Sequence, residues 1–318
     1  LYREVSAQVM AILADETPRV ERVSIDEAFI DITPGRFAPE DPLQVARRIS
    51  DRVAALGVTC SIGVGCNKTV AKIASERDKP FGLTIVRPGT EQRFLAALPV
   101  SAMSGIGRSA EERLRRMRIY TLGELSRAPE STLASIFGVN GVRMRQRALG
   151  LEVSEVTSLD EEREVKSVSN ERTFAKDLTE RGDIEAAIAL LGESVGRRLR
   201  RQGLTGATVT LKLKYSYGSG RTAQRRLPHP TDDENIFVAV ALELLDNIWQ
   251  EGMHVRLAGI GMSDFDHQGG IQTDLFCEID DRGAQSSDRR DLSVAIDAVR
   301  DKFGDTALSF GRQSRFND

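Results

Sequence analysis

Residues 20–32 read VERVSIDEAFIDI, and apolar and polar side chains alternate on both sides of a central Ile25-Asp26-Glu27-Ala28. Alternation at a period of two indicates β-strands, so we expect two strands that meet at a tight turn or bulge. On a straight strand Asp26 and Glu27 would point to opposite faces, and only a turn or bulge lets both carboxylates reach one site. Paired carboxylates suit hard divalent cations such as Mg²⁺. A solvated Asp-Glu pair at a hairpin is the plainer alternative.

The sequence around this stretch interleaves helices and strands, which predicts that residues 1–98 fold around one sheet. Asp41-Pro42 supplies a cap residue and a first-turn proline for a helix that ends at Gly57, and Asn67 opens another helix. The predicted ranges are helix 42–57, strand 58–64, helix 67–77 and strand 83–86.

Residues 99–157 show no strand pattern and predict a small all-helical module with glycine turns at residues 105–107 and 138–141. Residues 152–170 are polar and unpatterned, so we expect a tether there. The elements that follow have the order β-α-β-β-α-β, a split βαβ arrangement that gives a four-stranded sheet backed by two helices. Their predicted ranges are 169–174, 183–201, 207–215, 221–227, 233–249 and 255–262, with a last amphipathic helix at 292–303.

The net charge of −3 hides an uneven distribution along the chain. Residues 162–231 carry fourteen Lys and Arg against eight Asp and Glu, whereas residues 264–318 carry seven against twelve. A basic middle and an acidic tail are typical of a nucleic-acid-binding body with a separate partner-binding end, although solvated faces would give the same count.

Residues 60–80 read CSIGVGCNKTVAKIASERDKP and join a predicted strand to a basic helix that carries Lys68 and Lys72. Lysines near a helix N-terminus suit phosphate, through their charge and the free amides there. The stretch SIDEAFID, the run S-I-G-x-x-x-N-K-x-x-A-K-x-A-S and the following K-P-F-G together resemble the palm domain of Y-family (translesion) DNA polymerases of the bacterial polymerase IV type.

This resemblance implies an α+β multidomain fold and low-fidelity, template-directed DNA synthesis past lesions. It implies that Asp26 and Glu27 are catalytic and hold two Mg²⁺ ions, and that Lys79 contacts the incoming deoxynucleoside triphosphate. The domains that it implies are a partial palm at 1–98, a helix-hairpin-helix thumb at 99–157, a linker at 158–168, a DNA-binding little finger at 169–264 and an acidic tail at 265–318.

Two parts of the chain are expected to grip primer–template DNA through its phosphates. Residues 101–107 resemble a helix-hairpin-helix whose glycines expose backbone amides, and an arginine-rich helix follows. Polar and apolar residues alternate along residues 209–216, which gives one basic sheet face, and arginines on the next strand extend that charge. The alternatives are a plain helix–helix turn and an ordinary solvated sheet face. The expected DNA-binding residues are Gly105, Gly107, Arg113, Arg116, Lys212, Lys214, Arg221, Arg225 and Arg226.

The tail contains Gln272-Thr273-Asp274-Leu275-Phe276, which resembles the Q-x-x-L-F peptide that docks bacterial polymerases on the sliding clamp. Gln272, Leu275 and Phe276 are therefore the expected clamp-binding residues. No run of 18 apolar residues and no leader occurs, and the three cysteines contain no C-x-x-C pair. We expect a monomer in the cytoplasm, with no membrane association.

The family also uses a third carboxylate and an aromatic steric gate, both in an N-terminal segment that this chain lacks. The chain opens at Leu1 on an amphipathic pattern without Met, so we expect that a preceding segment is missing and that the fragment binds DNA weakly without extending it. Asp31 lies too far along its strand to replace the third ligand. Two other interpretations stay open: a catalytically inactive relative that binds DNA and the clamp as an adaptor, and a helix-hairpin-helix DNA-binding protein without phosphoryl chemistry.

Overall fold

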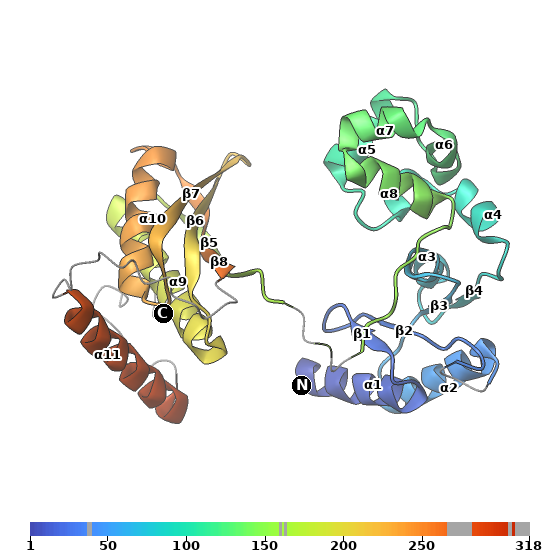
Figure 1. The fold of residues 1–318 in the computed structure, drawn as a ribbon, viewed down its shortest axis with the longest axis horizontal. Helices are drawn as coiled ribbons and strands as arrows, with labels where there is room; N and C mark the ends of the chain where they lie inside the picture. The colour runs from blue at the N-terminus through green and yellow to red at the C-terminus, as the bar shows by residue number, and fades with distance from the viewer. Residues whose placement is uncertain (37–39, 159–160, 162–163, 266–281, 305–306, 309–318) are drawn as a thin grey trace, which may run out of the picture. The chain divides into compact units, whose positions relative to one another are not determined.

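The computed structural model describes residues 1–36, 40–158, 161, 164–265, 282–304 and 307–308 (Figure 1). It divides the chain into two compact units, Leu1–Glu162 and Arg163–Asp318. Each unit has its own hydrophobic core.

Unit 1 begins with α1 (Tyr2–Glu16), followed by the short strands β1 (Val20–Arg22) and β2 (Ala28–Ile30). The two strands pair antiparallel with Val20 opposite Ile30, which confirms the predicted strand–turn–strand. Helix α2 (Pro42–Ala55) packs against α1, and the side chain of Asp41 caps it by accepting from the Leu43 amide. A small core from α1 and α2, with Ile12, Val45, Ile49 and Val53 buried, supports this part.

The strands β3 (Ile62–Val64) and β4 (Leu83–Ile85) flank α3 (Lys68–Arg77) and pair parallel to each other. The prediction of one sheet for residues 1–98 is wrong for the described chain, because β1–β2 and β3–β4 form two separate two-stranded sheets. Each of the four strands has only three residues and pairs with one neighbour.

Helices then dominate unit 1: α4 (Glu91–Ala96), a 3₁₀ turn at Val100–Ala102, α5 (Arg108–Arg116), α6 (Leu122–Arg127), α7 (Glu130–Phe137) and α8 (Val139–Ala148). A capping box fixes the start of α6, since Thr121 and Glu124 each accept from the other's backbone amide. One continuous core joins these helices to α3, with Val70, Ile73 and Ala74 packed in the same cluster as Leu95, Met103 and Leu114. The helical module and α3 therefore form one packed body.

Unit 2 runs β5 (Ser167–Leu178), α9 (Arg181–Gln202), β6 (Gly206–Tyr215), β7 (Gly220–Thr231), α10 (Glu234–Ile248) and β8 (Val255–Phe265). All neighbouring strands are antiparallel, and their order in the sheet is β5-β8-β6-β7. This is the predicted succession of elements. Val209, Leu211 and Leu213 are fully buried beneath α9 and α10, while the residues between them are at least partly exposed.

Helix α11 (Arg282–Phe303) follows and extends further toward the N-terminus than the predicted 292–303. Ion pairs hold it against α9: Asp301 contacts Arg197 and Arg201, Asp297 lies 2.7 Å from Arg200, and Arg300 lies 3.1 Å from Glu193. The sequence offered no role for this helix, and the structure shows that it covers part of α9.

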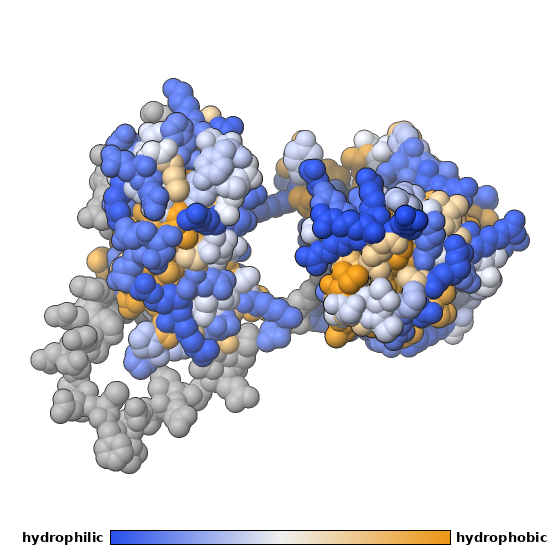
Figure 2. All heavy atoms as spheres, turned by 90° about the horizontal axis from the view of Figure 1, so that it is seen from above, coloured by the Kyte–Doolittle hydropathy of each residue, from blue (hydrophilic) through white to orange (hydrophobic). Residues whose placement is uncertain are grey.

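Figure 2 shows hydrophilic residues over most of the visible surface of each unit, with smaller hydrophobic areas among these residues. Among the helices of the described chain, none has both the length and the apolar character that crossing a bilayer requires.

Candidate active site and nucleic-acid surfaces

The turn between β1 and β2 carries the two predicted metal ligands. The amides of Val23 and Ser24 both donate to the carbonyl of Glu27, at 2.9 and 3.1 Å, and this closes the turn at the strand ends. Asp26 is exposed and accepts a short hydrogen bond from the Ser24 hydroxyl, while Glu27 is half-buried. The sequence therefore places both carboxylates on a turn, as predicted, and not on a straight strand.

Lysines of α3 and of the loop after it surround this turn. Lys72 forms an ion pair with Glu27 and lies 3.3 Å from Glu76, and Lys79 lies 2.7 Å from Glu76. The Ser24 hydrogen bond holds the pKa of Asp26 below its usual value, and the charges of Lys72 and Lys79 act in the same direction. Partial burial acts to lower the pKa of Lys72, but its bonds to Glu27 and Glu76 outweigh burial and raise it. Lys72 therefore acts on both carboxylates, through an ion pair with Glu27 and through its charge on Asp26.

The turn fits part of a metal shell. Asp26 and Glu27 supply carboxylate oxygens, which Mg²⁺ prefers, and Asp26 is open to solvent. Within the residues that the structure describes, no group of three or more metal-ligating side chains comes together. The Asp31 carboxylate is not part of this turn, and its Oδ1 accepts a hydrogen bond from the amide of Thr33 at 2.9 Å. Two protein ligands are therefore available at this turn.

The N-terminus of α3 is not the open phosphate site that the sequence suggested. Asn67 caps the helix by accepting from the Val70 amide at 3.0 Å, and the Thr69 amide donates to Glu152 Oε2 at 2.8 Å. The expectation of free amides there is wrong for the Val70 amide, which the Asn67 side chain caps, and for the Thr69 amide, which a carboxylate 83 residues away in sequence already binds. The lysine side chains stay the main candidates for a phosphate contact in this region.

The same contacts correct the predicted tether. Residues 150–158 lie along unit 1: Asn67 donates to the Gly150 carbonyl at 2.8 Å, and the Thr157 amide donates to Glu21 at 3.2 Å. A free connection from residue 152 onward is therefore wrong for the described residues up to 158.

The predicted hairpin lies between the 3₁₀ turn and α5. Gly105 has a φ of +94°, a left-handed conformation that favours glycine, and Gly107 is the N-cap of α5. Arg113 and Arg116 are exposed on that helix, whose Leu114 is fully buried in the core. The two predicted arginines thus lie on α5, and the two glycines lie in the loop directly before it.

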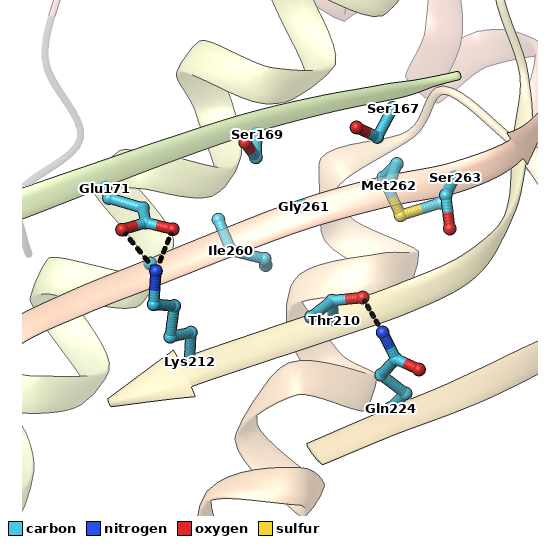
Figure 3. A pocket seen from close by; sticks show the side chains of 11 residues that line it. Ser167, Ser169, Glu171, Thr210, Lys212, Gln224, Ile260, Gly261, Met262 and Ser263 are labelled. Atoms are coloured by element: carbon cyan, nitrogen blue, oxygen red, sulfur yellow. Dashed lines mark hydrogen bonds and ion pairs between the residues drawn. The ribbon is translucent and has the colours of Figure 1, made fainter. Parts of the chain in front are cut away.

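The open face of the unit 2 sheet, away from α9 and α10, holds a shallow trough of about 260 Å³ (Figure 3). Its floor is β8, where Gly259 and Gly261 have no side chains, and its walls are side chains of β5 and β6. Lys212 lies on this face at 2.8 Å from Glu171, and Gln224 donates to Thr210 at 3.0 Å. The other lining residues include Ser167, Ser169 and Ser263.

Strand register separates the arginines that were expected to extend this face. Arg226 is opposite Thr208 and shares the open face with Lys212 and Lys214. Arg221 and Arg225 are opposite Leu213 and Val209, whose side chains are buried toward the helices, and Arg225 forms an ion pair with Glu243 of α10. The expectation that all three arginines join one basic face is therefore wrong for Arg221 and Arg225, because neighbouring strand residues alternate between faces.

The predicted clamp-binding residues Gln272, Leu275 and Phe276 lie outside the described residues.

Two family models match the chain: the impB/mucB/samB family at residues 1–76 and its C-terminal domain at residues 165–275. Curated relatives agree. DNA polymerase IV of Lactococcus lactis subsp. cremoris is 36% identical over 83% of this chain and 72% of the relative, and that of Dehalococcoides mccartyi is 34% identical over 100% of this chain and 79% of the relative. The chain belongs to the Y-family of DNA polymerases, among the DNA polymerase IV proteins.

Solved structures agree with this Y-family assignment at the level of the fold. A Y-family DNA polymerase chimera of Dbh and Dpo4 aligns with a TM-score of 0.68 at 23% identity, over 83% of this chain and 76% of that chain. A post-insertion binary complex of Dbh DNA polymerase aligns with a TM-score of 0.51 at 21% identity over the same shares.

Reasoning from the sequence missed several residues of this Y-family chain that shape its candidate site. Glu76 bridges Lys72 and Lys79 at spacings of four and three residues, a signal that was readable on a helix. The ion pair between Lys72 and Glu27, and the contacts of Glu152 and Arg147 with Thr69, join distant segments and leave no local signal.

Proposed function

We propose that this chain contains the catalytic palm, thumb and little finger of a DNA-directed translesion polymerase that adds deoxynucleotides to a primer end. The assignment follows the boundaries expected from the sequence: palm 1–98, thumb 99–157, linker 158–168, little finger 169–264 and acidic tail 265–318. It is supported by family membership and by a fold match to Y-family polymerases.

Asp26 and Glu27 are the proposed catalytic metal ligands, and two Mg²⁺ ions are the proposed cofactor. Bound ions at such a site supply charge stabilisation to the attacking and leaving oxygens of a phosphoryl transfer. The chain's own contribution is to hold both carboxylates on one turn, to bind Asp26 through the Ser24 hydroxyl and to bind Glu27 through Lys72. With two carboxylates at this turn and no larger ligand group among the described residues, we propose that this chain alone holds the ions too weakly to extend a primer.

Lys79 is the proposed contact to the incoming deoxynucleoside triphosphate. The Lys79 side chain is half-exposed, and within the described residues its amine forms an ion pair with the surface carboxylate of Glu76. A phosphate can take the place of that carboxylate. Lys72 binds the same Glu76 carboxylate and so adds positive charge to the same region.

Primer–template DNA is proposed to contact two surfaces, each through its phosphates. In unit 1 these are the amides of Gly105 and Gly107 with Arg113 and Arg116 behind them. In unit 2 they are the open sheet face with Lys212, Lys214 and Arg226, where a shallow trough runs over β8 between side chains of β5 and β6. Contacts of this kind position the duplex without reading its sequence, which suits a polymerase that continues past damaged bases.

We also propose that the protein is a cytoplasmic monomer that docks on the sliding clamp through Gln272, Leu275 and Phe276. The clamp peptide is testable by itself: Leu275→Ala/Phe276→Ala should abolish co-elution with the clamp and spare DNA binding. Retention of the complex by the double variant would rule out the motif.

The observation that carries the proposed chemistry is that two adjacent carboxylates on one turn both lie near Lys72, which pairs with Glu27 and whose charge acts on Asp26. The test is primer extension with Mg²⁺ by the full-length protein that contains this chain, compared with its Asp26→Ala/Glu27→Ala variant. Loss of extension with DNA binding intact supports the assignment. An unchanged rate in the double variant would end it.

A further inference from the structure

Arg147, in α8, joins three parts of unit 1 that lie far apart in sequence. Its Nε donates to Thr69 Oγ1 of α3 at 2.7 Å, and its Nη1 donates to the carbonyl of Ser104 at 2.8 Å. The carboxylate of Glu152 lies 3.6 Å from the same Nε. Thr69 is 3% exposed, so the guanidinium binds an acceptor at the edge of the core and not a solvated side chain.

These contacts close a small network. Glu152 faces Arg147 with one carboxylate oxygen and accepts from the Thr69 amide with the other, at 2.8 Å. Thr69 therefore binds the network through both its amide and its hydroxyl. Charge-assisted hydrogen bonds in a half-buried place are stronger and more directional than exposed ones, so the network fixes the guanidinium.

The carbonyl that Arg147 holds directly precedes the hairpin glycines. Ser104 is followed by Gly105, whose left-handed φ of +94° gives the loop a conformation that few other residues adopt. Two other backbone bonds fix the hairpin: the amide of the buried Ile106 donates to the Met103 carbonyl at 3.1 Å, and the Gly107 carbonyl accepts from the Glu111 amide at 2.9 Å. Neither bond joins the hairpin to α3 or α8. Fixing the Ser104 carbonyl therefore limits how far the amides of residues 105–107 can turn.

The other end of the network leads to the candidate active site. Thr69 lies in the first turn of α3, and Lys72 in the next turn binds Glu27. Helix α3 also shares the core of the helical module. Hydrophobic contacts are non-directional, whereas hydrogen bonds require a defined geometry. The polar network therefore fixes the orientation of α3 relative to α8 and Ser104.

We propose that Arg147 is a positioning residue that sets the phosphate-binding hairpin at 104–107 relative to α3 and the carboxylate turn. This inference rests on the proposed DNA contact of Gly105 and Gly107. It assigns to Arg147 no contact with DNA of its own.

The chain supplies a matched control on the same helix. Arg145 is about as exposed as Arg147, and it donates to the Ala128 carbonyl at 3.1 Å and lies 3.5 Å from Glu130. Both of its partners belong to the helical module, so Arg145→Ala removes a similar charge and similar bonds without touching α3 or Ser104.

The test measures the affinity of the whole chain for a primer–template duplex over a range of salt concentrations. Arg147→Ala should weaken binding by about tenfold, and Arg145→Ala much less, because hydrogen bonds of charged groups typically contribute at that scale. The slope of log affinity against log salt should stay the same, since positioning changes no phosphate contact. A slope that falls by about one would mean a direct phosphate contact and would overturn the proposal.

A second pair of variants keeps the test decisive if Arg147→Ala unfolds. Thr69→Val removes only the hydroxyl acceptor and should weaken DNA binding in the same direction, and its effect should largely disappear in an Arg147→Lys background. Both variants should also show faster amide exchange at residues 104–107. Additive effects of Thr69→Val and Arg147→Lys on affinity would refute the proposal, and so would unchanged amide exchange in both variants. Absence of DNA binding by the unmodified chain would instead refute the proposed function.

Discussion

Lys72 in α3 forms an ion pair with Glu27 in the β1–β2 turn, and its charge also lowers the pKa of the neighbouring Asp26. The lysine thus places a positive charge where the proposed divalent cation would bind. On the proposed metal site, the affinity for the ion should therefore depend on a residue that is not a ligand.

Lys72→Ala should strengthen Mn²⁺ binding at the turn by about fivefold, because a partly exposed ion pair of roughly 1 kcal/mol no longer competes for Glu27. Electron paramagnetic resonance of free Mn²⁺ measures the affinity directly. Asp26→Asn/Glu27→Gln in the same background should abolish the gain. A gain that persists in the triple variant would place the ion elsewhere.

Glu16, at the end of α1, has a buried side chain that binds Arg48 and Arg52 of α2. The hydrogen bond from Arg48 is the main reason why its pKa is lowered from 4.5, so the stabilisation is complete above that pH and is lost as the pH falls through the folded-state value. Glu16→Gln should lower the free energy of unfolding by about 1–3 kcal/mol at pH 7. Urea denaturation should show the two proteins converging at acidic pH, and a constant difference would contradict the assignment.

Arg225 and Arg226 are neighbours with equal charge on opposite faces of the unit 2 sheet. Arg226→Ala should weaken primer–template binding and reduce the salt slope by about one, as expected for the loss of one phosphate contact. Arg225→Ala should leave the slope unchanged, because Arg225 pairs with Glu243 on the helix side. Equal slopes for the two variants would show that the open face does not bind DNA.

Helix α11 should be released from α9 by Asp297→Asn/Asp301→Asn, since these two carboxylates bind three arginines of α9. The double variant should be cleaved within α11 about tenfold faster in limited proteolysis, the scale expected for losing charged hydrogen bonds. Glu243→Gln, which breaks an exposed pair on α10, serves as the control. High salt should speed cleavage of the unmodified chain toward the rate of the variant.

Local patterns predicted most of the elements, and distant contacts account for the errors. The period-two alternation of residues 209–215 and the capping residues Asp41 and Asn67 reflect interactions within one element, so they were readable. Whether two strand pairs merge into one sheet depends on packing between distant segments, which alternation does not encode. The face occupied by Arg221 and Arg225 follows from a register that only the paired strand fixes.

The candidate site divides in the same way. The carboxylates Asp26 and Glu27 were found because they are adjacent and flanked by strand signals. The contact of Glu152 with the N-terminus of α3 was not predicted, because a helix cap supplied from 83 residues away leaves no pattern in the sequence near the helix. Arg147 was hidden for the same reason, as one arginine among several on a basic helix.

Two buried glycines in the middle of β8, Gly259 and Gly261, form the base of the trough on the open sheet. The side chains of Glu171 and Ser169 on β5 lie over them: an added Cβ atom would be 2.6 Å from Glu171 Cγ at position 259 and 2.9 Å from Ser169 Cβ at position 261. A larger residue at either position would therefore push these β5 side chains outward and fill the trough. The depth of this proposed DNA-binding face thus depends on two residues that have no side chain.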